Sequence, residues 1–209
     1  DWITSRGLGD VYKRQKKMPL WGATDSDESK PKNLTTAQKK QVFANASGWV
    51  LEAGSALSGN DNTDADPEVL VAIGELSTSI GAADITEVEM VTTTADKSDG
   101  FTISVRVRYN EPVDVVTTGG TPTLAVTNGN EGTGTGRGPH SLSYASGTGT
   151  NELIFSLAIA AANAATNADD VLTVGAQSIA LNSGTIKDAS GTASDAAVAI
   201  SSAQGTAAG

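Results

Sequence analysis

The sequence predicts a mainly β protein built around an antiparallel β-sandwich. The clearest signal is residues 101–109, where apolar and polar side chains alternate without a break, as in a strand with one buried face. Similar short runs follow, separated by turns rich in Gly, Asn, Asp, Ser and Thr. Roughly seven short strands punctuated in this way are typical of a sandwich. Residues 84–209 are long enough to form one such core.

The same alternation indicates which side chains share that core. One apolar set runs along residues 101–109 and another along 153–159, so both are expected to face one interior: Phe101, Ile103, Val105, Val107, Tyr109, Leu153, Phe155, Leu157 and Ile159. The strands of the sandwich are expected at 85–94, 101–109, 122–127, 141–145, 152–159, 171–174, 177–181 and 196–201.

The chain before the sandwich divides into three segments by composition. Residues 1–17 are basic, residues 18–57 form a mixed module with two Trp residues, and residues 58–83 are an acidic linker followed by a strand at 69–74. Within the module, Thr35 or Thr36 is a candidate N-cap for a short helix over 35–46. The rest of the module is expected to be mostly irregular.

The basic segment ends in the run Asp10-Val11-Tyr12-Lys13-Arg14-Gln15, shortly before Met18. This run resembles the in-frame translation of a transposon-type sequencing adapter. Residues 1–17 are therefore expected to be an artefact outside the native fold, with the natural start at Met18 and an origin in environmental DNA. The alternative interpretation is an ordinary basic tail.

Charge and composition exclude several classes of partner. The chain carries a net charge of −10, and residues 1–17 hold five basic and two acidic side chains, which leaves −13 for the remainder. Such a surface repels phosphate backbones, so no nucleic acid partner is expected. No run approaches the roughly 20 apolar residues of a membrane helix, so no membrane insertion is expected. Without Cys there is neither a disulfide nor a thiolate metal site.

Four runs in the sandwich region form an ordered series: 107–113 with Glu111-Pro112-Val113, 120–126 with Gly120-Thr121-Pro122-Thr123-Leu124, 144–155 from Tyr144 to Phe155, and 181–188 from Leu181 to Asp188. The series resembles the immunoglobulin-like repeats of large bacterial surface proteins and of phage virion proteins. The resemblance covers more than half of the chain and implies an immunoglobulin-like sandwich. The Gly-rich insert 129–139 departs from the pattern and is expected to lengthen a loop.

The module supplies a second motif, Met18-Pro19-Leu20-Trp21-Gly22, followed by 28–35 and by Gly48-Trp49-Val50. It is similar to the opening of virion structural proteins of marine tailed phages, especially cyanophages. The resemblance implies a protein that decorates the capsid or tail and contacts a host surface or glycan. Oligomers are compatible with this role.

Catalytic chemistry has few candidate residues. His140 is the only histidine and follows the Gly-rich insert, where we expect an ordinary loop residue. No Ser-His-Asp arrangement in a strand-to-helix context can be built around it. The acidic residues are scattered, and too few aromatic residues remain to line a sugar cleft. No catalytic residue, cofactor or enzymatic activity is therefore expected.

Calcium is the one ion for which the sequence offers ligands. Asp169, Asp170 and Asp188 could approach one another at one end of a sandwich, either as a calcium site or as turn caps. Asp61, Asp64 and Asp66 lack the Gly and Glu positions of an EF-hand, which favours a solvated linker.

The module also contains the candidate docking residues. Two Trp side chains in a segment with few other apolar groups are either anchors for a partner or packed on the sandwich and on 69–73, and both interpretations remain open. The candidate docking residues are Trp21, Lys30, Lys32, Phe43 and Trp49.

The sequence thus predicts a non-enzymatic virion structural protein of a tailed phage, attached to other virion proteins through residues 18–57. One alternative is a fragment of a bacterial adhesin at the cell surface. A second is a calcium-dependent carbohydrate-binding module.

Overall fold

The protein is mainly β, as the sequence predicts. A computed structural model describes residues 30–31, 33–129, 139–163, 166, 170–190 and 193–208. The elements in chain order are α2 (Thr36–Lys40), β1 (Val42–Asn45), β2 (Gly48–Leu51), β3 (Glu68–Ala72), α3 (Leu76–Ser79), β4 (Ile85–Met90), β5 (Phe101–Val116), β6 (Thr123–Gly129), β7 (His140–Ser146), β8 (Thr150–Ile159), β9 (Val171–Thr173), β10 (Gln177–Ser178), β11 (Thr185–Asp188), β12 (Ala199–Ile200) and α4 (Ser202–Ala207).

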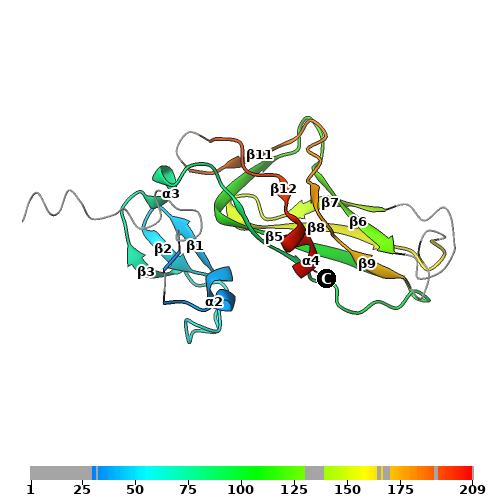
Figure 1. Cartoon of the computed structure of the whole chain (residues 1–209), viewed down its shortest axis with the longest axis horizontal. Coiled ribbons are helices and arrows are strands. Elements are labelled where there is room, and N and C mark those ends of the chain that lie inside the picture. The colour runs from blue at the N-terminus through cyan, green and yellow to red at the C-terminus, as the bar shows by residue number, and fades with distance from the viewer. Residues whose placement is uncertain are drawn as a thin grey trace, which may run out of the picture.

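The sandwich is organised by one long strand, β5, which has 16 residues. The antiparallel order is β11-β5-β8-β7-β6-β9, with β4 also paired to β5. The first half of β5 lies between β4 and β8, whereas its last residues pair with β11. β5 therefore connects the two sides of a curled sheet (Figure 1). A short pair, β10 and β12, lies beside it.

The core of the sandwich contains the residues that the alternation predicts. Val105 lies opposite Phe155 and Val107 opposite Leu153, and all four side chains are fully buried. Phe101 and Leu157 pack against this core while remaining partly exposed. The buried hydroxyl of Tyr109 donates to the carbonyl of Ala197 at 3.0 Å, so its polar end is satisfied inside the fold.

The turn between β7 and β8 explains one of the Gly positions in the series of motifs. Gly147 has a φ of +113°, and a Cβ atom there would lie 1.9 Å from the carbonyl oxygen of Glu152. No other residue fits that position without moving the backbone. The adjacent Thr148 N–H donates to the Tyr144 hydroxyl at 2.9 Å.

A small module precedes the sandwich and has its own sheet, in the order β1-β2-β3. We call this unit, residues 33–80, the small module. Its buried core comprises Val42, Ala44, Trp49, Leu51 and Leu76, with further apolar side chains packed around them. The strand expected at 69–74 is present as β3 but belongs to this sheet. The module is therefore more regular than expected (Figure 1).

The prediction of a helix over 35–46 is wrong beyond Lys40, where α2 ends. Thr35 caps α2 through a reciprocal pair of hydrogen bonds with Gln38, as its N-cap role requires. The chain then turns into β1, where Val42 pairs with Leu51 and Phe43 with Val50. Val42 and Phe43 are both buried, although they project to opposite faces of a strand. Burial on both faces favours the hairpin over a helix with one apolar side.

The C-terminal helix α4 was not expected from the sequence. It begins at Ser202, and the side chains of the N-cap residue Ser201 and of Gln204 form a capping box. Gln204 donates to the carbonyl of Ile85 at 2.7 Å, and the Met90 N–H donates to the carbonyl of Ala208 at 3.1 Å. α4 therefore covers the outer edge of β4. Among the described ranges, no helix has the length and apolarity needed to cross a bilayer.

The shared core generates a stability test. Val105 is fully buried between β4 and β8, so Val105→Asp places an unpaired carboxylate in the interior. We expect a loss of about 3–5 kcal/mol in the free energy of unfolding, measured by urea denaturation. The matched change Thr102→Asp, on the exposed face of the same strand, should cost less than about 1 kcal/mol. Equal effects of the two changes would contradict this register.

Candidate functional site

Of the candidate docking residues that the structure describes, Phe43 and Trp49 are buried and Lys30 is partly buried. Trp49 is fully buried in the small-module core, and Phe43 is 7% exposed. A buried ring offers no surface to a partner, so the interpretation of these two residues as anchors is corrected to internal packing. Trp21 and Lys32 lie outside the described residues. The indole Nε1 of Trp49 has no hydrogen-bond partner among the described residues.

Lys30 has a structural contact of its own. Its ammonium donates to the carbonyl of Lys39 at 2.6 Å, near the C-terminal end of α2. Burial lowers the pKa of Lys30 to about 8, partly offset by the charge of Glu87. The side chain thus ties the chain that precedes α2 to the helix, and it lies close to a group of charges at the junction with the sandwich.

That group, the junction cluster, consists of Lys40, Glu52, Glu87, Glu89, Arg106, Arg108 and Glu152. Arg108 is its centre. The guanidinium donates through Nη1 to Glu87 Oε2 at 2.8 Å and through Nε to Glu152. Glu52 of the small module lies 3.6 Å from its Nη2. Lys40 of α2 binds Glu87 on β4. The small module therefore contributes a cation, Lys40, and a carboxylate, Glu52, to ion pairs with the sandwich.

The cluster shifts the ionisation of its members. Burial and the neighbouring carboxylate of Glu152 raise the pKa of Glu52 to about 7, against the opposing charge of Arg108. Burial alone would also raise the pKa of Glu87, but hydrogen bonds from Lys40 and Arg108 lower it below its usual value. Hydrogen bonds from Arg108 to Glu152 and Glu87 outweigh burial and raise the pKa of Arg108. Glu87 is therefore held ionised, and Glu52 titrates near neutrality.

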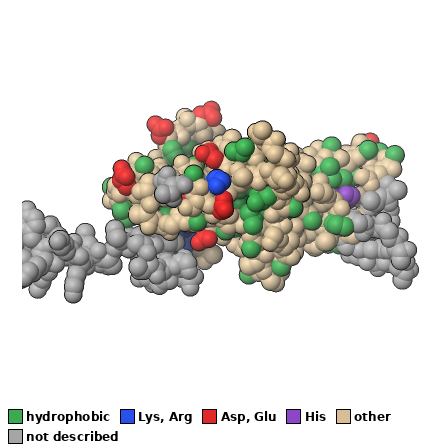
Figure 2. All heavy atoms as spheres, turned by 90° about the horizontal axis from the view of Figure 1, so that it is seen from above, with side chains coloured by type: hydrophobic (Ala, Val, Ile, Leu, Met, Phe, Trp, Pro, Cys, Tyr) green, Lys and Arg blue, Asp and Glu red, His purple; other side chains and the backbone are tan. Residues whose placement is uncertain are grey.

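Sequence reasoning missed this cluster because Arg108 sits on the polar side of the alternation in β5. A strand with one exposed face would leave such a side chain in water. In the structure, β1 contacts β5, and residues 107–111 are buried in succession. The small module thus covers part of the face that the pattern assigns to solvent. Figure 2 shows Asp and Glu side chains gathered at the small-module end of the visible face, and few charges over the sandwich.

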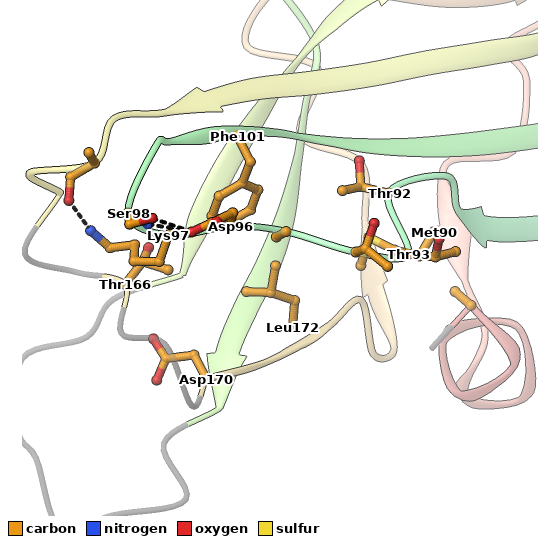
Figure 3. Close-up of a pocket in the computed structure, with 14 residues that line it drawn as sticks. Met90, Thr92, Thr93, Asp96, Lys97, Ser98, Phe101, Thr166, Asp170 and Leu172 are labelled. Carbon is orange, nitrogen blue, oxygen red and sulfur yellow. Dashed lines mark hydrogen bonds between the residues drawn. The ribbon is translucent and has the colours of Figure 1, made fainter.

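The loop 91–100 and β9 lie at the other end of the sandwich (Figure 1). A pocket lies between them (Figure 3). Its volume is about 910 Å³. Met90, Phe101 and Leu172 give it an apolar side, and Figure 3 shows Phe101 and Leu172 facing its interior. The polar residues that line it are Thr92, Thr93, Thr94, Asp96, Lys97 and Ser98.

The polar side of the pocket is held in place by short-range hydrogen bonds. The Ser98 N–H and hydroxyl both donate to Asp96 Oδ1, at 2.8 and 2.6 Å, and they lower the pKa of the Asp96 carboxyl. Lys97 donates to the carbonyl of Ala161 across the pocket. A pocket lined by both apolar side chains and hydroxyl and carboxylate groups is suited to binding a small polar ligand.

His140 is not the loop residue expected from the sequence. It begins β7, is 5% exposed, and its Nε2 lies 2.7 Å from the hydroxyl of Thr166. Burial lowers its pKa, against the opposing charge of Asp170. Thr166 is also buried, so the bond satisfies two polar groups inside the fold. Thr166 and Asp170 line the edge of the pocket.

The calcium candidates do not meet. Asp170 lies at the pocket beside β9, whereas Asp188 ends β11 and contacts Ser190 near α3. Asp169 lies outside the described residues. Among the described residues, no group of three or more carboxylates or imidazoles has a metal-binding arrangement. Asp61, Asp64 and Asp66 are exposed in the loop before β3.

Comparisons with models of protein families, with curated proteins and with solved structures found no match.

The raised pKa of Glu52 predicts how stability depends on pH. The folded state holds a proton on Glu52 up to about pH 7, whereas an unfolded Glu loses it near 4.5, so stability falls as the pH rises through this window. Glu52→Gln mimics the protonated form. We expect it to match wild type at pH 4.5 and to be more stable by roughly 1–2 kcal/mol at pH 8, after allowance for solvent screening.

The measurement is thermal unfolding of both proteins across pH 4.5–8.5. Glu89→Gln is the matched control, because Glu89 contacts the same two arginines at 3.8 and 3.9 Å from an exposed position. It should leave the slope of Tm against pH close to that of wild type. Identical slopes for wild type and Glu52→Gln would show that Glu52 does not titrate in this window.

Proposed function

We propose that the protein is a non-enzymatic structural protein of a tailed-phage virion. In this proposal the segment before α2, with Trp21, attaches the chain to other virion proteins, and the sandwich is displayed outward. The observation that carries the proposal is the separation of the small module and the pocket at opposite ends of the sandwich (Figure 1). One end is then available for attachment and the other for contact with a host.

The junction cluster supports such a display role. Ion pairs between Lys40 and Glu87 and between Glu52 and Arg108 join the small module to the sandwich, and β1 adds contacts with β5. An attached module would therefore hold the sandwich in a defined orientation. The phage and cell-surface interpretations both rest on the resemblance of residues 107–188 to immunoglobulin-like repeats. This resemblance is one of sequence pattern.

The pocket supports contact with a glycan in particular. A sugar has apolar C–H faces and hydroxyl edges, and the pocket is lined both by Phe101 and Leu172 and by Asp96, Ser98 and three successive Thr residues. Carboxylate and hydroxyl groups bind sugar hydroxyls by hydrogen bonds. A bacterial adhesin would use the same surface, so the adhesin interpretation is the second candidate.

DNA that flanks the gene separates these two candidates. Terminase, portal or tail genes next to this reading frame support the virion assignment. Tandem copies of the sandwich in one continuous reading frame overturn it in favour of the adhesin.

Attachment is tested by sedimentation with virions that carry this gene. Trp21→Ala should release the protein from particles, because an anchoring Trp contributes roughly 2 kcal/mol or more to an interface. Trp2→Ala, in residues 1–17, which are expected to lie outside the native fold, is the matched control and should have no effect. Trp49→Ala should instead destabilise the small module by about 3–5 kcal/mol. Unchanged sedimentation of Trp21→Ala would remove the attachment role from this residue.

Glycan contact is tested on a printed array of mono- and oligosaccharides. Asp96→Ala should weaken binding about tenfold, the loss expected for one hydrogen bond to a charged group. Asp99→Ala removes the same charge from the same loop at an exposed position outside the pocket and should bind like wild type. Equal binding by all three proteins would place the glycan elsewhere.

A further inference from the structure

A crowded group of oxygen atoms lies where the small module meets the end of the sandwich. The hydroxyl oxygen of Ser190 is 2.7 Å from Asp188 Oδ1, 2.7 Å from the backbone carbonyl oxygen of Ser77 and 3.2 Å from Glu111 Oε2. These atoms come from α3, from β5, and from β11 with the residues after it. Segments distant in the sequence thus bring two carboxylates, a hydroxyl and a carbonyl to one point.

The protons available at this point do not satisfy the acceptors. Ser190 Oγ carries one hydrogen and can donate to only one of its three neighbours. Asp188 Oδ1 already accepts from the Ser190 N–H at 2.6 Å. Glu111 is 0% exposed, and its Oε1 is buried without a hydrogen-bond partner. The second oxygen of this carboxylate is the one near Ser190, so the unpartnered oxygen borders the same group.

The charges are unbalanced as well. Within the described ranges, neither Glu111 nor Asp188 forms an ion pair, and Asp188 is 4% exposed. Asp84 adds a third negative charge nearby, and burial together with Asp188 and Asp84 raises the pKa of Glu111 to about 8. Buried carboxylates in natural folds are paired, protonated or bound to a metal.

We propose that this group is a calcium site with Glu111, Asp188, Ser190 and the Ser77 carbonyl as its protein ligands. Calcium takes six to eight oxygen ligands at 2.3–2.6 Å and tolerates irregular geometry, so that adjacent ligand oxygens lie about 3 Å apart. The oxygen spacings around Ser190 match that value. Magnesium demands a near-ideal octahedron and fits a buried, irregular set less well. With two carboxylates, the site neutralises a divalent ion.

The ion would link α3 of the small module to the end of β11 and to β5. It therefore complements the junction cluster, which holds the module through α2, the end of β2 and Arg108. The competing account of the same oxygens is a proton kept on Glu111. The two accounts differ in their response to calcium, and neither depends on the proposed virion role.

The experiment is thermal unfolding of the full chain at pH 8 in CaCl2 and in EGTA, with titration calorimetry using CaCl2. Calcium at about a hundred times its dissociation constant should raise Tm by roughly 5–10 °C, with one ion bound per chain. MgCl2 should give a smaller rise. Glu111→Gln and Asp188→Asn should each abolish the shift and the heat of binding, while circular dichroism shows that both variants remain folded in EGTA.

Asp64→Asn is the matched control, because it removes one carboxylate from the exposed acidic loop of the same protein. It should retain the full calcium shift. No shift in wild type overturns the proposal and leaves a protonated Glu111 as the account of the site. A shift that survives both Glu111→Gln and Asp188→Asn also overturns it, because calcium then binds elsewhere. If Glu111→Gln fails to fold, Asp188→Asn and the stoichiometry for wild type still decide the question.

Discussion

The buried guanidinium of Arg108 is the interaction on which the arrangement of the two parts depends. A buried charge is tolerated only with charged partners in good geometry. Arg108 has them on β4, β8 and the small module, through Glu87, Glu152 and Glu52. Removing Glu87 or Glu152 leaves the guanidinium less compensated, and its contact with Glu52 places the small module beside β4 and β8. Sheet pairing fixes β4 and β8, whereas the small module is held by the ion pairs of this cluster and by contacts between β1 and β5.

Much of the sandwich could be predicted because its signals are local. Alternation along β5 identified the strand and its buried face, and turn residues marked the ends of its neighbours. The same reasoning failed where a distant segment changes the environment. Val42 and Phe43 resemble one side of a helix until Val42 packs with Leu76 of α3 and β1 contacts β5. Arg108 looks solvated until the small module covers it. Trp49 could be an anchor or a core residue, and only the position of β3 and α3 decides between them.

The candidate sites also depend on segments that are distant in the sequence, so local signals did not reveal them. The pocket combines a loop, a short strand and the segment after β8, none of which carries a recognisable binding motif. The oxygens around Ser190 come from residues separated by more than a hundred positions, so no spacing rule could group them. Asp188 was a candidate ligand, but with the wrong companions, because Asp170 lies at the far end of the sandwich. The sequence singled out Asp188 as an acidic side chain of interest, and the fold places it beside Ser190 and Glu111.

The position of α4 against β4 has a consequence for the order in which the chain can fold during synthesis. The small module is formed by residues 33–80, so its hairpin and core can assemble early from nearby segments. The sandwich cannot close in the same way, because the outer edge of β4 is completed by Gln204 and Ala208. Pairing over such a sequence separation is slow. The edge of β4 is therefore open while the residues between β4 and α4 are synthesised, when an unpaired strand is exposed to other chains.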